Sequence, residues 1–279
     1  MTEPRLGQMA APTGEGDVIL RWWEWGPTSG LPVVCVHGLT RNGRDFDVLA
    51  RELAARGRRV LCVDVPGRGV SGWLPRRELY AVPVYAQCLA PLMAALGPHD
   101  WVGTSMGGLI GMAMAAMPGA TMRRFVVNDI GPFVPAAAIA RIQTYMAGAP
   151  TEFADLAALE AYLRRVHAPF GALSDAEWAH LAQRSARITP EGRTVLHYDP
   201  AIGGPMMAGA PADIEIWPLW EAASARPTLV LRGEASDLLL PETAARMAAR
   251  VRVETIPGCG HAPALMEASQ VALVADFLS

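Results

Sequence analysis

Short, almost continuously apolar runs alternate along this 279-residue chain with longer segments that repeat Ala and Leu at helical spacing. After a first, partly polar run at residues 18–25, the apolar runs lie at 33–38, 59–67, 101–105, 125–129, 228–233 and 251–258. The helical segments lie at 46–57, 85–97, 105–119, 241–251 and 264–279. Strands that are apolar throughout are covered on both faces, and repeated strand–helix–strand units pair in parallel. The pattern therefore predicts an α/β fold with a mostly parallel sheet and helices on both of its faces.

The strand pattern is interrupted once, between residues 132 and 220. This segment contains only helical stretches separated by Pro- and Gly-rich turns. Because apolar strands flank it on both sides, the sequence predicts a helical insertion at 132–220 in a core domain made of 1–131 and 221–279. The run at 18–25 partly alternates polar and apolar residues, so we expect it at an antiparallel edge of the sheet.

Composition excludes several classes of partner. The formal net charge is −3 with both signs interspersed, which gives no reason to expect nucleic acid or an anionic membrane as a partner. The first residues do not resemble a secretory signal, and apolar runs stop well short of the roughly 20 residues of a membrane span. The four cysteines are scattered without CxxC spacing, which argues against a metal site. We expect a cytoplasmic monomer or homodimer that needs no metal or cofactor and does not insert into membranes.

Residues 103–107 read Gly-Thr-Ser-Met-Gly and join an apolar strand to an Ala- and Met-rich helix. In this context G-x-S-x-G forms a nucleophile elbow, a sharp turn that exposes the serine at the N-terminus of the following helix. The alternative is an ordinary strand-to-helix turn in which Ser105 only caps the helix. Because the motif is short, it does not by itself choose between the two.

A serine nucleophile needs a base that a third group holds in place. His261 lies in a glycine-bearing loop between the last predicted strand and the last helix. Asp237 follows the strand at 228–233, and we expect its carboxylate to reach the second nitrogen of His261. Glu234 is a nearby rival, and Asp237 could instead cap the helix that begins at Pro241. The chain order Ser, Asp, His is one of the known orders of a catalytic triad.

Attack on an ester carbonyl places negative charge on its oxygen, and backbone N–H groups can stabilise that charge. We expect one donor from the Leu39 amide, in the loop "HGLTRN", and the other from the Met106 amide, directly after Ser105. His37 is interpreted as a structural residue that supports this loop.

The motifs "HGLTRN", "DVPGRGVSGW", "GTSMGG", "LRGEASDLLLP" and "GCGHAP" together resemble those of α/β-hydrolase fold serine hydrolases over residues 18–279. The resemblance implies an eight-stranded type of sheet, a triad of Ser105, His261 and Asp237, and oxyanion donors at Leu39 and Met106. It also implies that the insertion at 132–220 is a helical cap over the active site.

The expected activity is hydrolysis of carboxylic esters of small to medium, mainly apolar substrates through an acyl-enzyme intermediate. Serine at the nucleophile position argues against the epoxide hydrolase and haloalkane dehalogenase branches, which use Asp there. Arg68 stands where many members have His, in a loop that we interpret as structural. The candidate substrate contacts are Arg41, Phe133, Tyr145 and Trp217.

Two alternatives stay open. The first is a carbon–carbon bond hydrolase that acts on ring-cleavage dienoates; that branch usually has a second small residue in the oxyanion loop and Asn before the nucleophile. This chain has Leu39, Thr40 and Thr104 at those places, which favours the esterase. The second is a ligand-binding receptor or scaffold that keeps an intact triad. Slow turnover together with tight, saturable ligand binding would favour this alternative.

Overall fold

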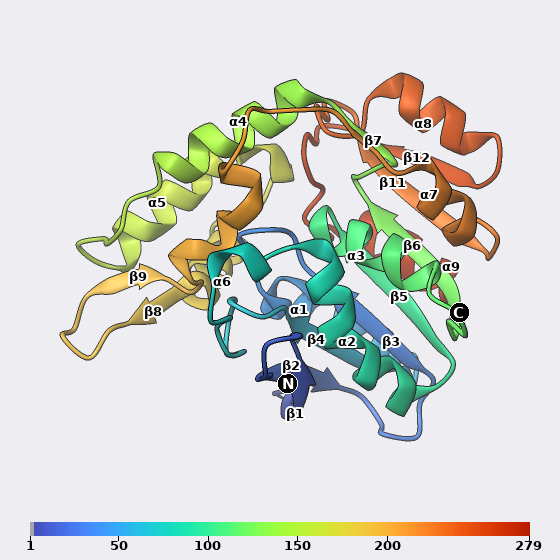
Figure 1. The fold of residues 1–279 in the computed structure, drawn as a ribbon, viewed down its shortest axis with the longest axis horizontal. Helices are drawn as coiled ribbons and strands as arrows, with labels where there is room; N and C mark the ends of the chain where they lie inside the picture. The colour runs from blue at the N-terminus through green and yellow to red at the C-terminus, as the bar shows by residue number, and fades with distance from the viewer. Residues whose placement is uncertain (1–2) are drawn as a thin grey trace.

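An eight-stranded sheet organises the molecule, which a computed structural model describes for residues 3–279 (Figure 1). The strand order is β1-β2-β4-β3-β5-β6-β11-β12. The strands from β4 to β12 pair in parallel, whereas β2 is antiparallel to both β1 and β4. Their bounds are β1 (Arg5–Pro12), β2 (Asp17–Trp25), β3 (Pro32–Val36), β4 (Arg59–Asp64), β5 (His99–Thr104), β6 (Met122–Asn128), β11 (Thr228–Gly233) and β12 (Arg252–Ile256). The predicted fold class is confirmed.

The antiparallel edge of the sheet is one strand further out than predicted. The run at 18–25 becomes β2, but β1 pairs along its whole outer side, from Arg5 against Glu24 to Pro12 against Asp17. Half of the residues in the β1 segment "RLGQMAAP" are exposed, and only Ala11 is buried. A strand of this kind gives only a weak signal in sequence, because pairing rather than burial defines it.

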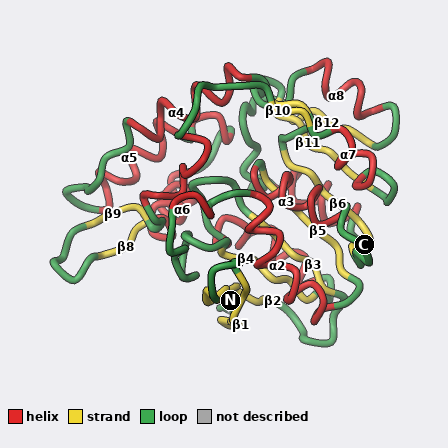
Figure 2. The backbone as a smooth tube through the Cα atoms, viewed as in Figure 1, coloured by secondary structure: helices red, strands yellow, loops and turns green. Residues whose placement is uncertain are grey.

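Helices cover both faces of the sheet, as Figures 1 and 2 show. One face carries α2 (Val82–Leu96), α3 (Met106–Ala115), α7 (Trp217–Ala223) and α8 (Pro241–Ala248), and the other carries α1 (Asp47–Ala55) and α9 (Ala268–Phe277). Neighbouring residues of β5 enter different cores: Trp101 packs on the α2–α3 side and Val102 on the α1–α9 side. This double coverage explains why the central strands are apolar throughout.

The segment between β6 and β11 combines several helices with long loops. It contains α4 (Ala136–Ala147), α5 (Leu156–Val166) and α6 (Asp175–Ser185), together with a hydrophobic cluster around Leu159, Leu163 and Leu181 that Met266, in the loop before α9, also joins. Its last helix, α7, nevertheless packs against α3 of the main sheet layer. The short helices of the chain are η1 (Gly43–Phe46), η2 (Arg77–Leu79), η3 (Ala168–Phe170) and η4 (Pro200–Met207).

The sequence predicted no strand in this segment, and the structure contains two very short pairs. They are β7 (Phe133–Val134) with β10 (Ile214–Glu215), and β8 (Ala186–Ile188) with β9 (Thr194–Leu196). Runs of two or three residues are too short for an alternation pattern to reveal them.

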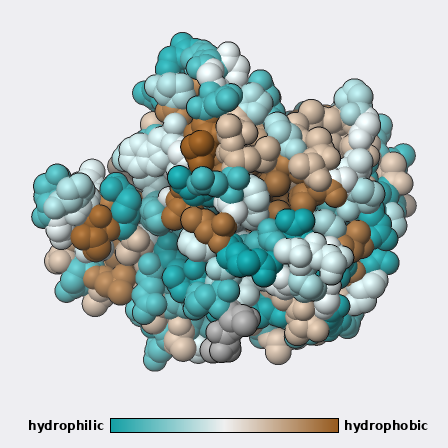
Figure 3. Space-filling model, turned by 90° about the horizontal axis from the view of Figure 1, so that it is seen from below, coloured by the Kyte–Doolittle hydropathy of each residue, from teal (hydrophilic) through white to brown (hydrophobic). Residues whose placement is uncertain are grey.

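The surface seen in Figure 3 carries small hydrophobic groups separated by hydrophilic side chains. Within residues 3–279, none of the helices combines the length and the apolar character needed to cross a bilayer.

Asp64 joins the end of β4 to the loops on either side of it, and it gives a first prediction. Its buried carboxylate accepts hydrogen bonds from Gly43 N (2.6 Å), Val70 N (2.9 Å) and Trp23 Nε1 (3.2 Å). Burial raises the pKa of Asp64 to about 6, against the opposing effect of these donors, so the group is ionised at pH 7.5. Asp64→Asn relieves the burial of a charge, but it also turns an NH2 group toward an N–H donor. We expect the lost hydrogen bonding to be the larger effect, so the free energy of unfolding should fall by about 1–3 kcal/mol.

Urea denaturation at pH 7.5 measures this loss. The exposed Asp17→Asn variant, at the start of β2, removes a carboxylate that has no such set of donors and should change stability by less than about 0.5 kcal/mol. Equal stability of the two variants would show that the Asp64 network contributes nothing.

Candidate active site

Ser105 lies in a sharp turn between β5 and α3, with φ 52° and ψ −116°. The flanking glycines permit this turn: a Cβ on Gly107 would lie 1.9 Å from the carbonyl oxygen of Val36, and one on Gly103 would lie 2.3 Å from that of Gly107. The Ser105 amide donates to Asn128 O at 2.9 Å, and its side chain makes no capping bond to α3. The turn therefore has the geometry of a nucleophile elbow, and the helix-cap alternative does not hold.

His261 connects the serine to a carboxylate. It lies in the loop between β12 and α9, where Nε2 is 2.8 Å from Ser105 Oγ and Nδ1 is 2.7 Å from Asp129 Oδ2. In the neutral imidazole, an Nδ1–H that donates to Asp129 leaves Nε2 free to accept the Ser105 proton. Serine, imidazole and carboxylate thus form one continuous line of hydrogen bonds.

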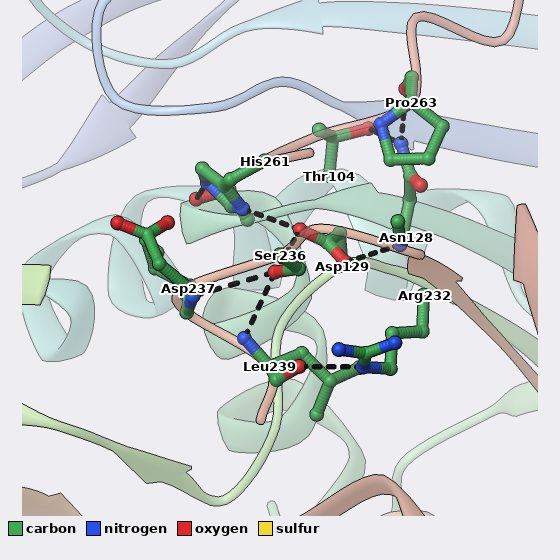
Figure 4. A network of polar contacts seen from close by, with 12 residues as sticks. Thr104, Asn128, Asp129, Arg232, Ser236, Asp237, Leu239, His261 and Pro263 are labelled. Carbon is green, nitrogen blue, oxygen red and sulfur yellow. Dashed lines mark hydrogen bonds and ion pairs between the residues drawn. The ribbon is translucent and has the colours of Figure 1, made fainter. Parts of the chain in front are cut away.

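The carboxylate in that line is Asp129, not the predicted Asp237. Asp129 directly follows β6 and is fully buried. Besides His261, its carboxylate accepts hydrogen bonds from Gly233 N and from Ser236 Oγ, both at 2.7 Å. These donors reach it from the end of β11 and the loop that follows. Three donors compensate the buried charge and fix its orientation (Figure 4).

The prediction that Asp237 is the partner of His261 was wrong, because its side chain points away from the histidine. Ser236 turns its side chain inward to Asp129, so the next side chain, that of Asp237, points the opposite way (Figure 4). Asp237 is about half exposed and forms a two-point ion pair with Arg141 of α4, with Oδ1 2.9 Å from Nη2. It does not cap α8 either, because Leu240 occupies that position without a side-chain bond. The rival Glu234 accepts from Gly258 N on the exposed side of the loop.

A signal for Asp129 was present in the sequence. The run "FVVND" ends in Asp immediately after an apolar strand, whereas Asp237 lies further along the loop after the run at 228–233. Asp129 has φ 58°, and its amide donates to Leu231 O at 2.8 Å. Backbone hydrogen bonds between β6 and β11 decide whether the loop after β6 or the loop after β11 turns a carboxylate toward His261. The spacing of residues in the sequence does not reveal these bonds.

The two predicted oxyanion residues lie beside Ser105. A Cβ on Gly38 would be 3.7 Å from Ser105 Cβ, so the loop after β3 passes directly over the serine. Leu39 and Met106 line a cavity together with Ser105. Burial lowers the pKa of His37 to about 3. This neutral ring accepts from Val65 N at 3.0 Å through Nε2 and donates to Gly38 O at 2.7 Å through Nδ1, which fits the structural role expected of it.

Arg68 is fully buried and contacts both Leu39 and Met106. Its Nε donates to Leu39 O at 2.9 Å, and its Nη2 lies 3.6 Å from Met106 Sδ. Nη1 donates to Pro66 O and to the Tyr85 hydroxyl. Sequence reasoning treated Arg68 only as part of a structural loop, but it links the Leu39 loop to the start of α3.

Two cavities adjoin Ser105 on different sides. The larger, of about 210 Å³, is almost entirely apolar, with Leu109, Ile139 and Met206 among its walls. The smaller, of about 60 Å³, is lined by Ser105, His261 and a set of polar and aromatic side chains that includes the predicted Arg41 and Tyr145. Leu39, Ser105 and Ile142 line both cavities.

The other two predicted substrate contacts lie elsewhere. Phe133 pairs with Glu215 between β7 and β10, and Trp217 lies under the guanidinium of Arg246, 3.4 Å from the ring centroid. Neither is among the described residues that line the two cavities. Within residues 3–279 no three His, Cys, Asp or Glu side chains are grouped as metal ligands would be.

Comparison with known proteins agrees with this architecture. The profile of the alpha/beta hydrolase family matches residues 33–277. The chain belongs to the alpha/beta hydrolase family. The 3-hydroxybutyrate-oligomer hydrolase of Cupriavidus necator is 39% identical over 99% of this chain and 98% of its own. A crystal structure of an alpha/beta hydrolase from Novosphingobium aromaticivorans is 34% identical, with a TM-score of 0.87 over 100% of this chain and 99% of that one.

A more distant relative, the 2-(acetamidomethylene)succinate hydrolase of Mesorhizobium japonicum, is 25% identical over 84% of this chain and 82% of its own. The relatives are named hydrolases and esterases, and this family member is accordingly a hydrolase.

His37 gives a prediction about pH. The unfolded chain protonates this residue below about pH 6.5, whereas the folded chain does so only near pH 3. The stability associated with neutral His37 is therefore complete above pH 6.5 and is lost as pH falls toward 3. In His37→Gln, the slope of unfolding free energy against pH between 4 and 6 should be shallower by about 1.4 kcal/mol per pH unit, which corresponds to one proton.

Urea titrations across that pH range measure both slopes. We expect the variant to be less stable at pH 8, because it loses the hydrogen bonds that the imidazole makes with Val65 N and Gly38 O. Parallel curves for the two proteins would mean that His37 keeps its ordinary pKa in the folded protein.

Proposed function

We propose that this hydrolase cleaves carboxylic esters by nucleophilic catalysis, with Ser105 as nucleophile, His261 as base and Asp129 as the group that orients the base. The observation that carries the proposal is the unbroken line Ser105 Oγ–His261 Nε2 (2.8 Å) and His261 Nδ1–Asp129 Oδ2 (2.7 Å). A serine held in this way can lose its proton to the imidazole as it attacks a carbonyl carbon.

The reaction has two halves. In the first, Ser105 Oγ bonds to the acyl carbon, His261 takes the serine proton, and the same proton then passes to the departing alcohol. In the second, His261 removes a proton from water, the resulting hydroxyl attacks the acyl carbon, and Ser105 regains its proton as the acid leaves. Asp129 holds the Nδ1 side of the ring and stabilises the imidazolium that forms in each half.

The amides of Leu39 and Met106 supply the oxyanion hole in this proposal. Both residues border the cavity at Ser105, and Met106 begins α3, where the first amides of a helix have no partner within the helix. Arg68 supports the arrangement because it holds the Leu39 carbonyl and contacts the Met106 side chain. A fixed loop orients its amide before the substrate arrives, which is the condition for effective oxyanion stabilisation.

The segment at 132–220 acts as the cap in this proposal. Ile142, Tyr145 and His167 of this segment form walls of the smaller cavity, and Ile139 and Met206 form walls of the larger. The substrate is thus enclosed between the cap and the carboxyl ends of the strands, where exclusion of water strengthens the polar interactions of the reaction.

The larger cavity favours small to medium acyl or alcohol groups of low polarity, since its volume is about 210 Å³ and its walls are apolar. The Cupriavidus necator relative, which aligns over almost the full length of both chains, is named for 3-hydroxybutyrate oligomers. Short oligoesters of hydroxy acids are therefore the first natural substrates to test.

A second candidate function is cleavage of a bond other than an ester, of the carbon–carbon type in ring-cleavage dienoates. The Mesorhizobium japonicum relative is named a 2-(acetamidomethylene)succinate hydrolase and not an esterase. Its similarity to this chain therefore supports testing substrates other than esters. Rapid cleavage of a dienoate with slow ester turnover would favour it.

The two candidate carboxylates provide the most direct test. Asp129→Asn replaces the partner of His261, which disturbs the tautomer and orientation of the ring, so kcat for p-nitrophenyl butyrate should fall about 10³- to 10⁴-fold. Asp237→Asn leaves the hydrogen-bond line intact, so kcat should stay within about threefold of the unmodified enzyme. Steady-state kinetics without added metal measure both variants.

Ser105→Ala serves as the inactive reference, and a fluorophosphonate probe reports whether Ser105 is reactive. If Asp237→Asn abolishes turnover and Asp129→Asn does not, the triad assignment is wrong. If the folded protein reacts with the probe at Ser105 yet hydrolyses esters poorly, the esterase assignment fails; tight ligand binding would then favour a receptor.

A further inference from the structure

The smaller cavity beside Ser105 has two arginines in its walls, and they come from different parts of the chain. Arg41 lies in the loop after β3, and Arg141 lies on α4 of the cap. Arg41 is almost fully buried, with its guanidinium 5.9 Å from the centroid of the Phe170 ring, another wall residue. Both arginines therefore border the space in which Ser105 and His261 also lie.

Each arginine has a carboxylate partner that lies outside this space. Arg41 uses Nε and Nη2 to bind both oxygens of Asp45, each at 2.7 Å. Arg141 uses the same two nitrogens to bind both oxygens of Asp237. Neither aspartate is among the described residues that line the cavity. The ion pairs orient the two guanidiniums and leave the Nη1 group of each outside the pair.

The remaining walls also favour an anion. None of the described wall residues is acidic, and Thr40, Tyr145 and His167 are neutral hydrogen-bonding groups. Burial lowers the pKa of His167 far below its ordinary value, and the positive charge of Arg41 lowers it further. Neutral donors and two oriented guanidiniums around a small space match the requirements of a carboxylate.

We propose that Arg41 and Arg141 form a binding site for a free carboxylate on the alcohol side of the substrate ester. This inference rests on the proposed esterase function and names the substrate class more narrowly. The scissile carbonyl lies at Ser105, where the two cavities meet. The acyl part enters the apolar cavity, and the carboxylate-bearing alcohol part enters the cavity with the arginines.

The arrangement has a consequence for oligoesters of hydroxy acids. In such a chain, the unit that carries the free carboxylate is the alcohol component of the last ester bond. Binding of that carboxylate next to Ser105 selects the last bond, so the enzyme releases one hydroxy acid at a time from the carboxyl end. Atoms balance as in simple ester hydrolysis: water is consumed, and one alcohol and one acid form at each step.

A pair of substrates that differ only in charge tests the proposal. The linear dimer of 3-hydroxybutyrate, as the free acid and as its methyl ester, has the same internal ester bond in both forms. The unmodified enzyme should show kcat/KM at least about tenfold higher for the free acid. In Arg141→Gln, kcat/KM for the free acid should fall about tenfold to a hundredfold, mainly through KM, while hydrolysis of the internal bond of the methyl ester changes less than about threefold.

Two further variants separate binding from folding. Arg141→Lys keeps the positive charge but loses the planar fork, so part of the preference for the free acid should return. Arg193→Gln removes an exposed arginine of the cap that is paired with Glu152, away from both cavities, and should leave both substrates unaffected. Arg141 is itself partly exposed, so its replacement does not open the core.

The outcomes are distinct. Equal losses for the acid and the methyl ester in Arg141→Gln, or no preference in the unmodified enzyme, would overturn the carboxylate site while ester hydrolysis stands. If neither the dimer, its methyl ester nor p-nitrophenyl butyrate is hydrolysed, the proposed function fails and this inference fails with it.

Discussion

The buried carboxylate of Asp129 is the point on which the rest of the site depends. It accepts hydrogen bonds from His261 Nδ1, Gly233 N and Ser236 Oγ, which belong to the loops after β12 and at the end of β11. Removal of any donor would leave a buried charge less well compensated, which is costly in a protein interior. The neighbouring Asn128 adds a second link, because its Nδ2 donates to Pro263 O at 2.8 Å within the His261 loop. The position of the base relative to Ser105 is thus fixed by the ends of three adjacent strands.

This arrangement also leaves Asp237 available for a different role. Its carboxylate points away from the histidine and binds Arg141 of α4, so the loop after β11 turns Ser236 toward Asp129 and Asp237 toward α4. The helical segment that contains α4 begins within a few residues of Asp129 and leads back to the sheet at β11. Asp129, this helical segment and the proposed carboxylate site are therefore linked through one short region of the chain. A change in the β6–β11 loops should affect orientation of the base and selection of the substrate together.

Much of the fold could be predicted from the sequence, because continuous apolar runs at 33–38, 59–67 and 228–233 leave few alternatives to a covered parallel sheet. Ser105 and His261 could be singled out, since glycines and strand ends mark their loops. The choice between Asp129 and Asp237 could not, because both follow apolar strands and backbone hydrogen bonds between the strands decide which one points inward. β1 and the two short strand pairs between β6 and β11 were missed for a related reason: their pairing leaves little trace in hydropathy.

The whole site depends on the bond between the Nδ1 proton of His261 and the carboxylate of Asp129. Proton NMR at low temperature measures it directly, through the low-field resonance of an imidazole N–H that is held by a carboxylate and shielded from exchange with water. We expect this resonance in the unmodified protein and in Asp237→Asn, and we expect it to be absent in Asp129→Asn and in His261→Gln. A resonance that survives in Asp129→Asn and disappears in Asp237→Asn would rule out Asp129 and restore Asp237 as the partner of His261.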